Sequence, residues 1–262
     1  MAALCFLVIY CYFTLLLFSY TPTVMAYTMN PSDSIMDGQT LNSQSGTFQL
    51  GFFTPSARSK KRYLGIWYTS VPAQTVVWVA NRDSPILDTS GVLKIDSTGN
   101  LVILVNQTGR VIWSSNSSKS VESPIVEFLE SGNLVLKDSR NHDKDSYVWQ
   151  SFDYPTDTLL PGMKLGSNRI TGARWYLSSW KNVVDPSHGD FSYVLEHGVY
   201  PEFIMRKGRH KYYRGGSWNG LQASGSPEFQ TNTKFTYEYI DNGDCCRACL
   251  LNTLLTRWVH AY

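Results

Sequence analysis

A strand–turn–strand pattern occurs more than once in this sequence and limits what the chain can fold into. Residues 92–104 and 125–137 each place alternating apolar residues before a polar turn, then Gly-Asn and a second apolar run. Glycine and asparagine tolerate positive φ, so each copy predicts a tight hairpin. Tryptophan recurs at Trp78, Trp113 and Trp149, 35 and 36 residues apart. A large apolar residue at a fixed phase predicts similar sheets that share one core.

A degenerate copy precedes these two. Residues 45–50 repeat the Ser-Gly start and the period-two apolar pattern of residues 90–95. Residues 63–68 then occupy the place of residues 99–103 in the next copy. Strands are short, and no run of ten residues shows a 3.6-residue apolar period, which predicts an all-β fold. A two-sheet sandwich is the generic alternative, but the threefold period favours a prism of three sheets.

Bulk properties are those of a globular chain. It has 262 residues, of which 43% are hydrophobic, and a net charge of +2. This near-neutral balance provides no general attraction for nucleic acid or for an anionic membrane surface, so neither partner is expected.

The first 26 residues are set apart by an apolar run over residues 4–18. The run ends near Ala26, a small residue suited to a cleavage site, and predicts a secretory signal peptide over residues 1–26. An uncleaved N-terminal anchor is the alternative, since the run almost reaches bilayer-spanning length. No second run of that length follows. We therefore expect a secreted, extracellular product with no membrane span in the mature chain.

The glycosylation sequons and the cysteines also bear on whether the chain is secreted. N-glycosylation sequons begin at Asn106 and Asn116, as suits a secreted protein. Residues 27–244 contain no cysteine, so core packing rather than disulfides must hold the body together. The cysteines beyond that body are Cys245, Cys246 and Cys249.

Several motifs of the first half are similar to one known family. They are residues 48–53, 64–68, 77–82, 99–102 and 149–162. In this order they resemble the bulb-type lectin domain of the plant G-type lectin S-receptor-like serine/threonine kinases, with kinship to the S-locus glycoproteins of pollen recognition. The resemblance implies a three-sheet β-prism with pseudo-threefold symmetry over residues 27–151. It also implies a place in the extracellular part of a cell-surface receptor.

The second half continues the resemblance. Its matching segments are residues 177–181, 189–193 and 212–220. They resemble the S-locus glycoprotein region, and Trp180 and Trp218 lie 38 residues apart, close to the earlier period. A second prism, diverged and incomplete, is therefore expected over residues 152–241.

Residues 242–262 do not resemble the family. Relatives continue here with more strands, cysteine-rich modules, a transmembrane helix and a cytoplasmic kinase, so the chain resembles a truncated receptor. Residues 250–255 would suit one or two helical turns, too short to be stable alone. A misread exon junction, a frameshift and an early end stay open as explanations of this tail.

By the resemblance, bulb lectins bind sugar through Gln-x-Asp-x-Asn-x-Val-x-Tyr, whose carboxylate and amides bond sugar hydroxyls while the tyrosine caps the ring. The matching positions of one copy are Asp96, Thr98, Asn100, Val102 and Leu104. Those of the next copy are Leu129, Ser131, Asn133, Val135 and Lys137. Only asparagine and valine survive in both copies. We therefore interpret Asn100 and Asn133 as turn residues, and we do not expect mannose binding through this motif, although the fold is of a carbohydrate-binding type.

The resemblance points to another ligand surface. In S-receptor kinases small secreted peptides dock on variable loops of the second prism, which correspond to residues 199–214 here. Arginine and aromatic residues alternate in this stretch, as they do in interface anchors. The alternative is a solvated hairpin whose charges keep an edge strand from pairing. The predicted ligand-contacting residues are Arg206, Lys207, Arg209, His210, Lys211, Tyr212 and Tyr213.

No catalytic residue, cofactor or metal is expected. The sequence lacks a glycine-rich nucleotide loop and a Gly-x-Ser-x-Gly elbow, and His188-Gly-Asp-Phe is followed by Ser192, which is not the kinase motif. The three tail cysteines and His260 have poor spacing for zinc, so free or intermolecularly paired thiols are expected.

The sequence thus predicts an extracellular recognition module that binds a peptide or a glycan at the plant cell surface, without catalysis of its own. Three alternatives stay open. The chain would be a secreted lectin for mannose-type glycans, a soluble decoy that pairs with a full-length receptor kinase relative, or a non-functional truncated product.

Overall fold

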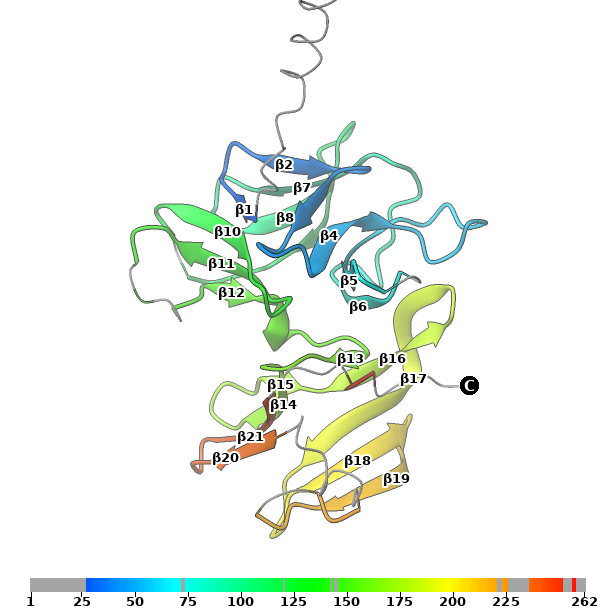
Figure 1. Ribbon diagram of the computed structural model, residues 1–262, viewed down its shortest axis with the longest axis vertical. Coiled ribbons are helices and arrows are strands. Elements are labelled where there is room, and N and C mark those ends of the chain that lie inside the picture. Colours follow the sequence, from blue (N-terminus) through cyan, green and yellow to red (C-terminus); the bar gives the residue numbers. More distant parts are fainter. Residues whose placement is uncertain are drawn as a thin grey trace, which may run out of the picture.

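The computed structural model describes residues 27–71, 74–119, 121–141, 143, 146–220, 223–225, 236–251 and 256–257. Within them the chain is built of β-strands, with one short 3-10 helix, η1 (Ser151–Asp153), between two halves. Figure 1 shows the halves stacked along the long axis, the earlier strands above and the later strands below. The all-β prediction is confirmed. The predicted signal peptide, residues 1–26, lies outside the described residues.

The first half contains three four-stranded antiparallel sheets. The first has the order β3-β4-β5-β6, with bounds Thr40–Asn42, Phe48–Phe53, Tyr63–Tyr68 and Val76–Val79. The second has the order β2-β7-β8-β9, with bounds Ser34–Met36, Gly91–Ile95, Leu101–Val105 and Val111–Ser114. The third has the order β1-β10-β11-β12, with bounds Thr28–Met29, Pro124–Phe128, Leu134–Asp138 and Trp149–Gln150. Strands β1, β2 and β3 follow one another and give one edge strand to each sheet.

The register of each central hairpin follows the repeat seen in the sequence. Leu50 pairs with Ile66, Leu93 with Ile103, and Val126 with Leu136, and all six side chains are fully buried in one core. The predicted equivalence of residues 63–68 and the later copies is therefore confirmed. Because side chains alternate along a strand, a shift of one residue would turn these pairs away from the core.

The hairpin turns use glycine as the repeat predicted. Gly99 and Gly132 have φ of 80° and 84°, in the left-handed region. In the first turn Gly99 N–H donates to Asp96 O at 3.0 Å, while Asp96 N–H donates to Asn100 O at 2.8 Å. This is the three-residue hairpin loop that needs a glycine at its last position. The asparagine that follows has another task, described below.

Three tryptophans lie at the centre of the first half. Each comes from the last strand of its sheet, and the ring centroids of Trp78, Trp113 and Trp149 are 5.6 to 6.3 Å apart, edge to face. Trp78 and Trp149 are buried, and Trp113 is half-buried. Edge-to-face contacts are the preferred geometry of aromatic pairs. The predicted shared axis is confirmed.

The second half also contains three sheets, of unequal size. One has the order β16-β17-β18-β19, with bounds Leu177–Asn182, Asp185–Glu196, Glu202–Lys207 and His210–Ser217. Another has the order β15-β14-β21-β20, with bounds Arg174–Trp175, Lys164–Asn168, Cys245–Leu251 and Thr236–Asp241. The last pairs β13 with β22, with bounds Thr158–Leu159 and Thr256–Arg257.

Two expectations about the second half were wrong. Residues 250 and 251 are not helical, because they end strand β21, which lies between β14 and β20; residues 252–255 are outside the described chain. Cys246 and Ala248 of this strand are buried in the core, so cross-strand packing decides its conformation. Trp180 does not mark a second axis either. It stacks on Phe53 of the first half, with ring centroids 6.4 Å apart.

The halves are joined by a buried arginine. Arg82 follows β6 and is buried, and its guanidinium donates to Pro186 O at 2.7 Å, Ser178 Oγ at 2.9 Å and Ser179 O at 3.0 Å. Burial lowers the pKa of Arg82, against the opposing pull of nearby carboxylates. Since these acceptors all lie in the second half, Arg82 fastens β16 and β17 to the first prism.

Candidate recognition surfaces

The first candidate surface is the turn between β7 and β8, which carries the degenerate sugar motif. The Oδ1 atom of Asp96 accepts a hydrogen bond from the Thr98 hydroxyl at 2.6 Å and another from the backbone N–H of Asn100 at 3.0 Å. Partial burial acts to raise the pKa of Asp96, but these hydrogen bonds lower it. Asn100 Oδ1 accepts from Ser115 Oγ at 2.9 Å and from Ser117 N–H at 2.8 Å. These polar groups hold the turn to the segment that follows β9.

The equivalent asparagine of the next copy is engaged more completely. Asn133 is buried, and its Nδ2 donates to Gln150 Oε1 at 2.9 Å. Its Oδ1 accepts from Ser151 Oγ at 3.1 Å and from Phe152 N–H at 3.2 Å. Asn100 and Asn133 therefore have the same structural role. Each links a hairpin turn to a serine, Ser115 or Ser151, that lies two residues after a core tryptophan. The geometry agrees with their interpretation as turn residues.

The second candidate surface is the hairpin of β18 and β19, where all seven predicted ligand-contacting residues lie. Strand β19 is at the edge of its sheet. Tyr212 and Tyr213 are 65% and 50% exposed, so large aromatic area faces solvent. Arg209 and His210 are exposed at the tip.

Other cations of this hairpin are paired within their own sheet. Glu196 accepts from Arg206 and, at 2.7 Å, from Lys211 Nζ. Arg214 Nη1 lies 2.8 Å from Glu202 Oε2, and Lys207 Nζ lies 5.4 Å from the centroid of the Phe191 ring. Among the described residues, Arg209 at the hairpin tip is therefore the cation of this hairpin for which no acidic or aromatic partner is found, and it lies near the two exposed tyrosines.

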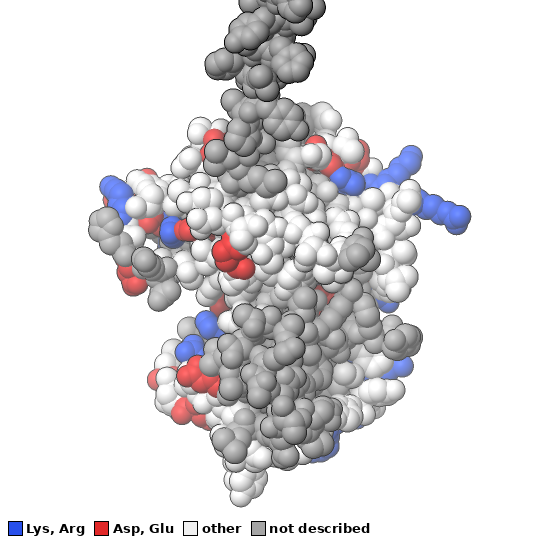
Figure 2. Space-filling model, viewed as in Figure 1, with Lys and Arg blue, Asp and Glu red and all other residues white. Residues whose placement is uncertain are grey.

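A third surface is a cleft of about 660 Å³ between the two halves. We call it the inter-prism cleft. Tyr154 stacks on Trp149 with ring centroids 5.7 Å apart, and Asp83 Oδ2 lies 2.7 Å from His188 Nδ1 across the boundary. Its lining combines aromatic and polar residues: Trp113, Trp149, Tyr154, Tyr176, Asp83, Asp153, Arg174, His188 and Asn116. Figure 2 shows the outline of the molecule narrowing where the halves meet, with charged residues scattered over the visible face.

The surroundings of the cleft shift the pKa values of Asp83 and Tyr154. Burial acts to raise the pKa of Asp83, but the hydrogen bonds from His188 lower it. Burial raises the pKa of Tyr154. The cleft therefore holds the carboxylate of Asp83 and the phenol of Tyr154, which can accept and donate hydrogen bonds.

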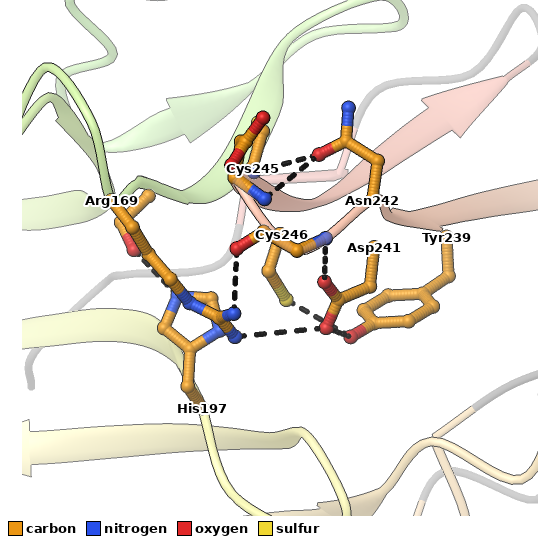
Figure 3. A network of polar contacts seen from close by, with 10 residues as sticks. Arg169, His197, Tyr239, Asp241, Asn242, Cys245 and Cys246 are labelled. Carbon is orange, nitrogen blue, oxygen red and sulfur yellow. Dashed lines mark hydrogen bonds and ion pairs between the residues drawn. The ribbon is translucent and has the colours of Figure 1, made fainter.

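The tail cysteines form no recognisable reactive site. Figure 3 shows Cys245 and Cys246 in the polar network around Arg169. Burial raises the pKa of the Cys246 thiol, whose Sγ lies 2.9 Å from the Tyr239 hydroxyl. All three thiols are free, and no group of three metal-ligating side chains exists within the described residues, which exclude His260. A protonated, buried thiol is a poor nucleophile.

Comparison with known proteins shows which proteins the chain is related to. The D-mannose binding lectin family matches residues 75–181, from the start of β6 into β16. The chain is 43% identical to the S-locus-specific glycoprotein S6 of Brassica oleracea over 89% of its own length and 53% of that protein. It is 47% identical to the receptor-like serine/threonine-protein kinase SD1-8 of Arabidopsis thaliana, over 79% of the chain and 25% of the kinase. The chain is homologous to the S-locus glycoproteins and the S-receptor-like kinases.

The chain spans about half the length of the S-locus-specific glycoprotein S6 and a quarter of the length of the receptor kinase SD1-8. Among solved structures, the snowdrop mannose-specific agglutinin matches 46% of the chain at 18% identity with a TM-score of 0.34, which is too low to support an argument. No helix of the described residues is long and apolar enough to cross a membrane. The boundaries predicted at residues 151 and 241 stay predictions.

Sequence reasoning missed the inter-prism cleft. The tryptophan period indicated Trp113 and Trp149, but as core residues only. Asp83 and His188 are 105 residues apart in the chain and meet through the docking of the halves. No spacing rule relates such positions, so only the arrangement of the two halves shows this surface.

Proposed function

We propose that this chain is an extracellular recognition module of the S-locus glycoprotein and S-receptor-like kinase class, and that its ligand is a peptide bound on the β18–β19 hairpin. The observation that carries the proposal is the exposed pair Tyr212 and Tyr213 beside the exposed Arg209 and His210 at the hairpin tip. Aromatic and arginine side chains dominate binding energy at protein interfaces. Kinship with secreted glycoproteins and receptor ectodomains supports an extracellular location, and a full-length receptor kinase relative is a further proposed partner.

Mannose binding through the degenerate motif is the second candidate. The matching family is described as D-mannose binding, which favours it. Against it, the amide oxygens of Asn100 and Asn133 already accept hydrogen bonds from serine hydroxyls and backbone amides. Binding sugar there would require breaking these contacts, and each unmade buried hydrogen bond costs about 1–3 kcal/mol.

The proposal is tested by selection from a displayed peptide library on the whole secreted chain, followed by affinity measurement. Enriched peptides should bind a variant carrying Tyr212→Ser and Tyr213→Ser at least about tenfold more weakly, a loss of about 1.4 kcal/mol. The matched control is Tyr27→Ser, an exposed tyrosine of the first half. Peptides that bind both variants equally would overturn the hairpin as the site.

A glycan array separates the second candidate. On the peptide hypothesis the wild-type chain binds no mannose-type glycan. Binding that is lost in Asn100→Ala, while the folded state is retained, would instead establish a lectin activity. The hairpin variant should leave any such signal unchanged.

A further inference from the structure

The inter-prism cleft has the size and chemistry of a binding site that the hairpin proposal does not use. Its volume of about 660 Å³ falls within the range of roughly 300–1,000 Å³ typical of small-molecule sites. Trp113 is half-buried and Tyr154 is 56% exposed, so aromatic area is open to an occupant. Asp83 and Arg174 add polar groups to the same lining. Aromatic faces with a few polar groups suit a sugar, which has apolar ring faces and hydroxyls at its edge.

Asn116 lies on the lining of this cleft and begins a glycosylation sequon with Ser117 and Ser118. Its side chain is exposed, and its side-chain amide group has no hydrogen-bond partner among the described residues. Asn100 and Asn133, in contrast, are both engaged. The Asn116 amide nitrogen is thus free to carry a sugar.

The backbone holds Asn116 in place. Its φ is 53°, and it is the one non-glycine residue with positive φ in the described chain. Asn116 N–H donates to Ser114 Oγ at 3.1 Å, Ser117 N–H to Asn100 Oδ1 at 2.8 Å, and Ser117 Oγ to Val148 O at 3.3 Å. Asparagine tolerates this region, and the three hydrogen bonds fix the segment around it. A group attached at Asn116 therefore starts from a defined point on the cleft.

We propose that the N-linked glycan carried by Asn116 folds back into the inter-prism cleft and bridges the two halves of the molecule. The cell's oligosaccharyltransferase makes the bond. Nδ2 of Asn116 displaces the lipid diphosphate from the anomeric carbon of the first sugar and loses one proton. Because the glycan is tethered to the lining, its effective concentration at the cleft is in the millimolar range, so weak contacts suffice to keep it there. The inference needs the sequon to be used, but it does not depend on the hairpin as a ligand surface.

Asn106 provides a matched control in the same molecule. It follows β8, its side chain is exposed, and it is not among the residues that line the cleft. A glycan on Asn106 does not start from the lining of the inter-prism cleft. The two sequons therefore differ in the feature that the proposal invokes.

The test uses the whole chain secreted from a mammalian host. Glycopeptide mass spectrometry first establishes which sequons carry sugar. The native protein is then treated with peptide N-glycosidase, and release is followed at each site. We expect release at Asn116 at least about tenfold slower than at Asn106, corresponding to about 1.4 kcal/mol of protection. After denaturation the two rates should become equal.

Two variants attribute the protection to the cleft. Tyr154→Ala and Tyr176→Ala each remove an aromatic lining residue, and each should raise the native rate at Asn116 towards that at Asn106. Tyr200→Ala, outside the cleft, should leave the ratio unchanged. An unmodified Asn116, equal native rates at the two sites, or protection that survives both cleft variants in folded protein would each overturn the proposal.

Discussion

The two halves of this molecule are both built from antiparallel sheets, but the sheets and the cores differ. In the first half, three sheets of equal size each contribute a tryptophan to one centre, and equivalent apolar pairs recur in every hairpin. Within the described residues of the second half, two sheets have four strands and the third has two, and Trp180 packs onto Phe53 of the first half. The first half therefore has a central core formed by its own three sheets, whereas the second half packs part of its apolar surface, at Trp180, against the first half.

Exposed apolar side chains follow the same division. Large hydrophobic residues at the surface of the second half include Ile170, Val183, Val199 and Tyr200, which are 71% to 92% exposed. These residues lie in turns and bends between strands, where single exposed apolar side chains are ordinary.

The largest expected effect separates the two cores directly. Trp78→Ala removes a buried indole that also donates from Nε1 to Tyr154 O at 2.9 Å, and should lower the free energy of unfolding by about 3–5 kcal/mol. Trp218→Ala removes a half-buried ring that packs at a tilt against Tyr239, and should cost about 1–2 kcal/mol. Urea unfolding followed by far-ultraviolet circular dichroism measures both. Equal losses would break the comparison.

The next effect tests how far the second half depends on docking. Arg82→Met keeps the length of the side chain but leaves its carbonyl acceptors without a donor, at a cost of about 2–3 kcal/mol. We expect limited proteolysis to cut residues 152–262 before residues 27–151 in the wild type, and to do so faster in this variant. Arg58→Met, at an exposed position, should change neither rate. Equal protease resistance of both halves would contradict the dependence.

A smaller effect compares two copies within the first half. Asn133→Ala should cost about 1–3 kcal/mol, because a buried amide and its partners lose their hydrogen bonds. Asn100→Ala should cost about 0.5–1.5 kcal/mol, since water replaces part of its contacts at a more exposed turn. Thermal unfolding of the two variants side by side measures the difference. The reverse order would show that the copies are not equivalent in the way described.

The smallest effect is the pH dependence of the contact between the halves. The hydrogen bonds from His188 lower the folded-state pKa of Asp83 below its usual 3.8. Its contribution is therefore present above pH 3.8 and is lost as the pH falls through the lowered value. Because both side chains are about half exposed, it should be under about 1 kcal/mol. The melting temperatures of wild type and Asp83→Asn should differ at neutral pH and converge in acid; a constant difference would assign the contact another role.

Much of the first half could be predicted from local patterns. Alternation in residues 92–104 set the strand faces, and the glycine of each Gly-Asn pair has the positive φ that its turn needs. The start of the first half was harder to predict, since residues 34–42 form β2 and β3 in two different sheets. Short strands pair through backbone groups, which leave little trace in side-chain pattern.

The second half was harder to predict because its decisive contacts are distant in the chain. The tail strand β21 pairs with β14 roughly eighty residues earlier, with Cys246 opposite Ser167. The predicted ligand residues did meet on one hairpin, but the pairing of Arg206 and Lys211 with Glu196 shows which charges remain available. Neither result follows from sequence spacing.

By itself, the sequence determined the strands, the phase of the repeat and the three tryptophans, because side-chain alternation and turn chemistry act over a few residues. Only the tertiary structure decided that Asn100 and Asn133 are internal fasteners, that Arg82 holds the halves together, and that a cleft opens between them with Asn116 on its lining. These features depend on how two sheet assemblies dock, and docking is governed by surface shape and buried polar partners far apart in the chain.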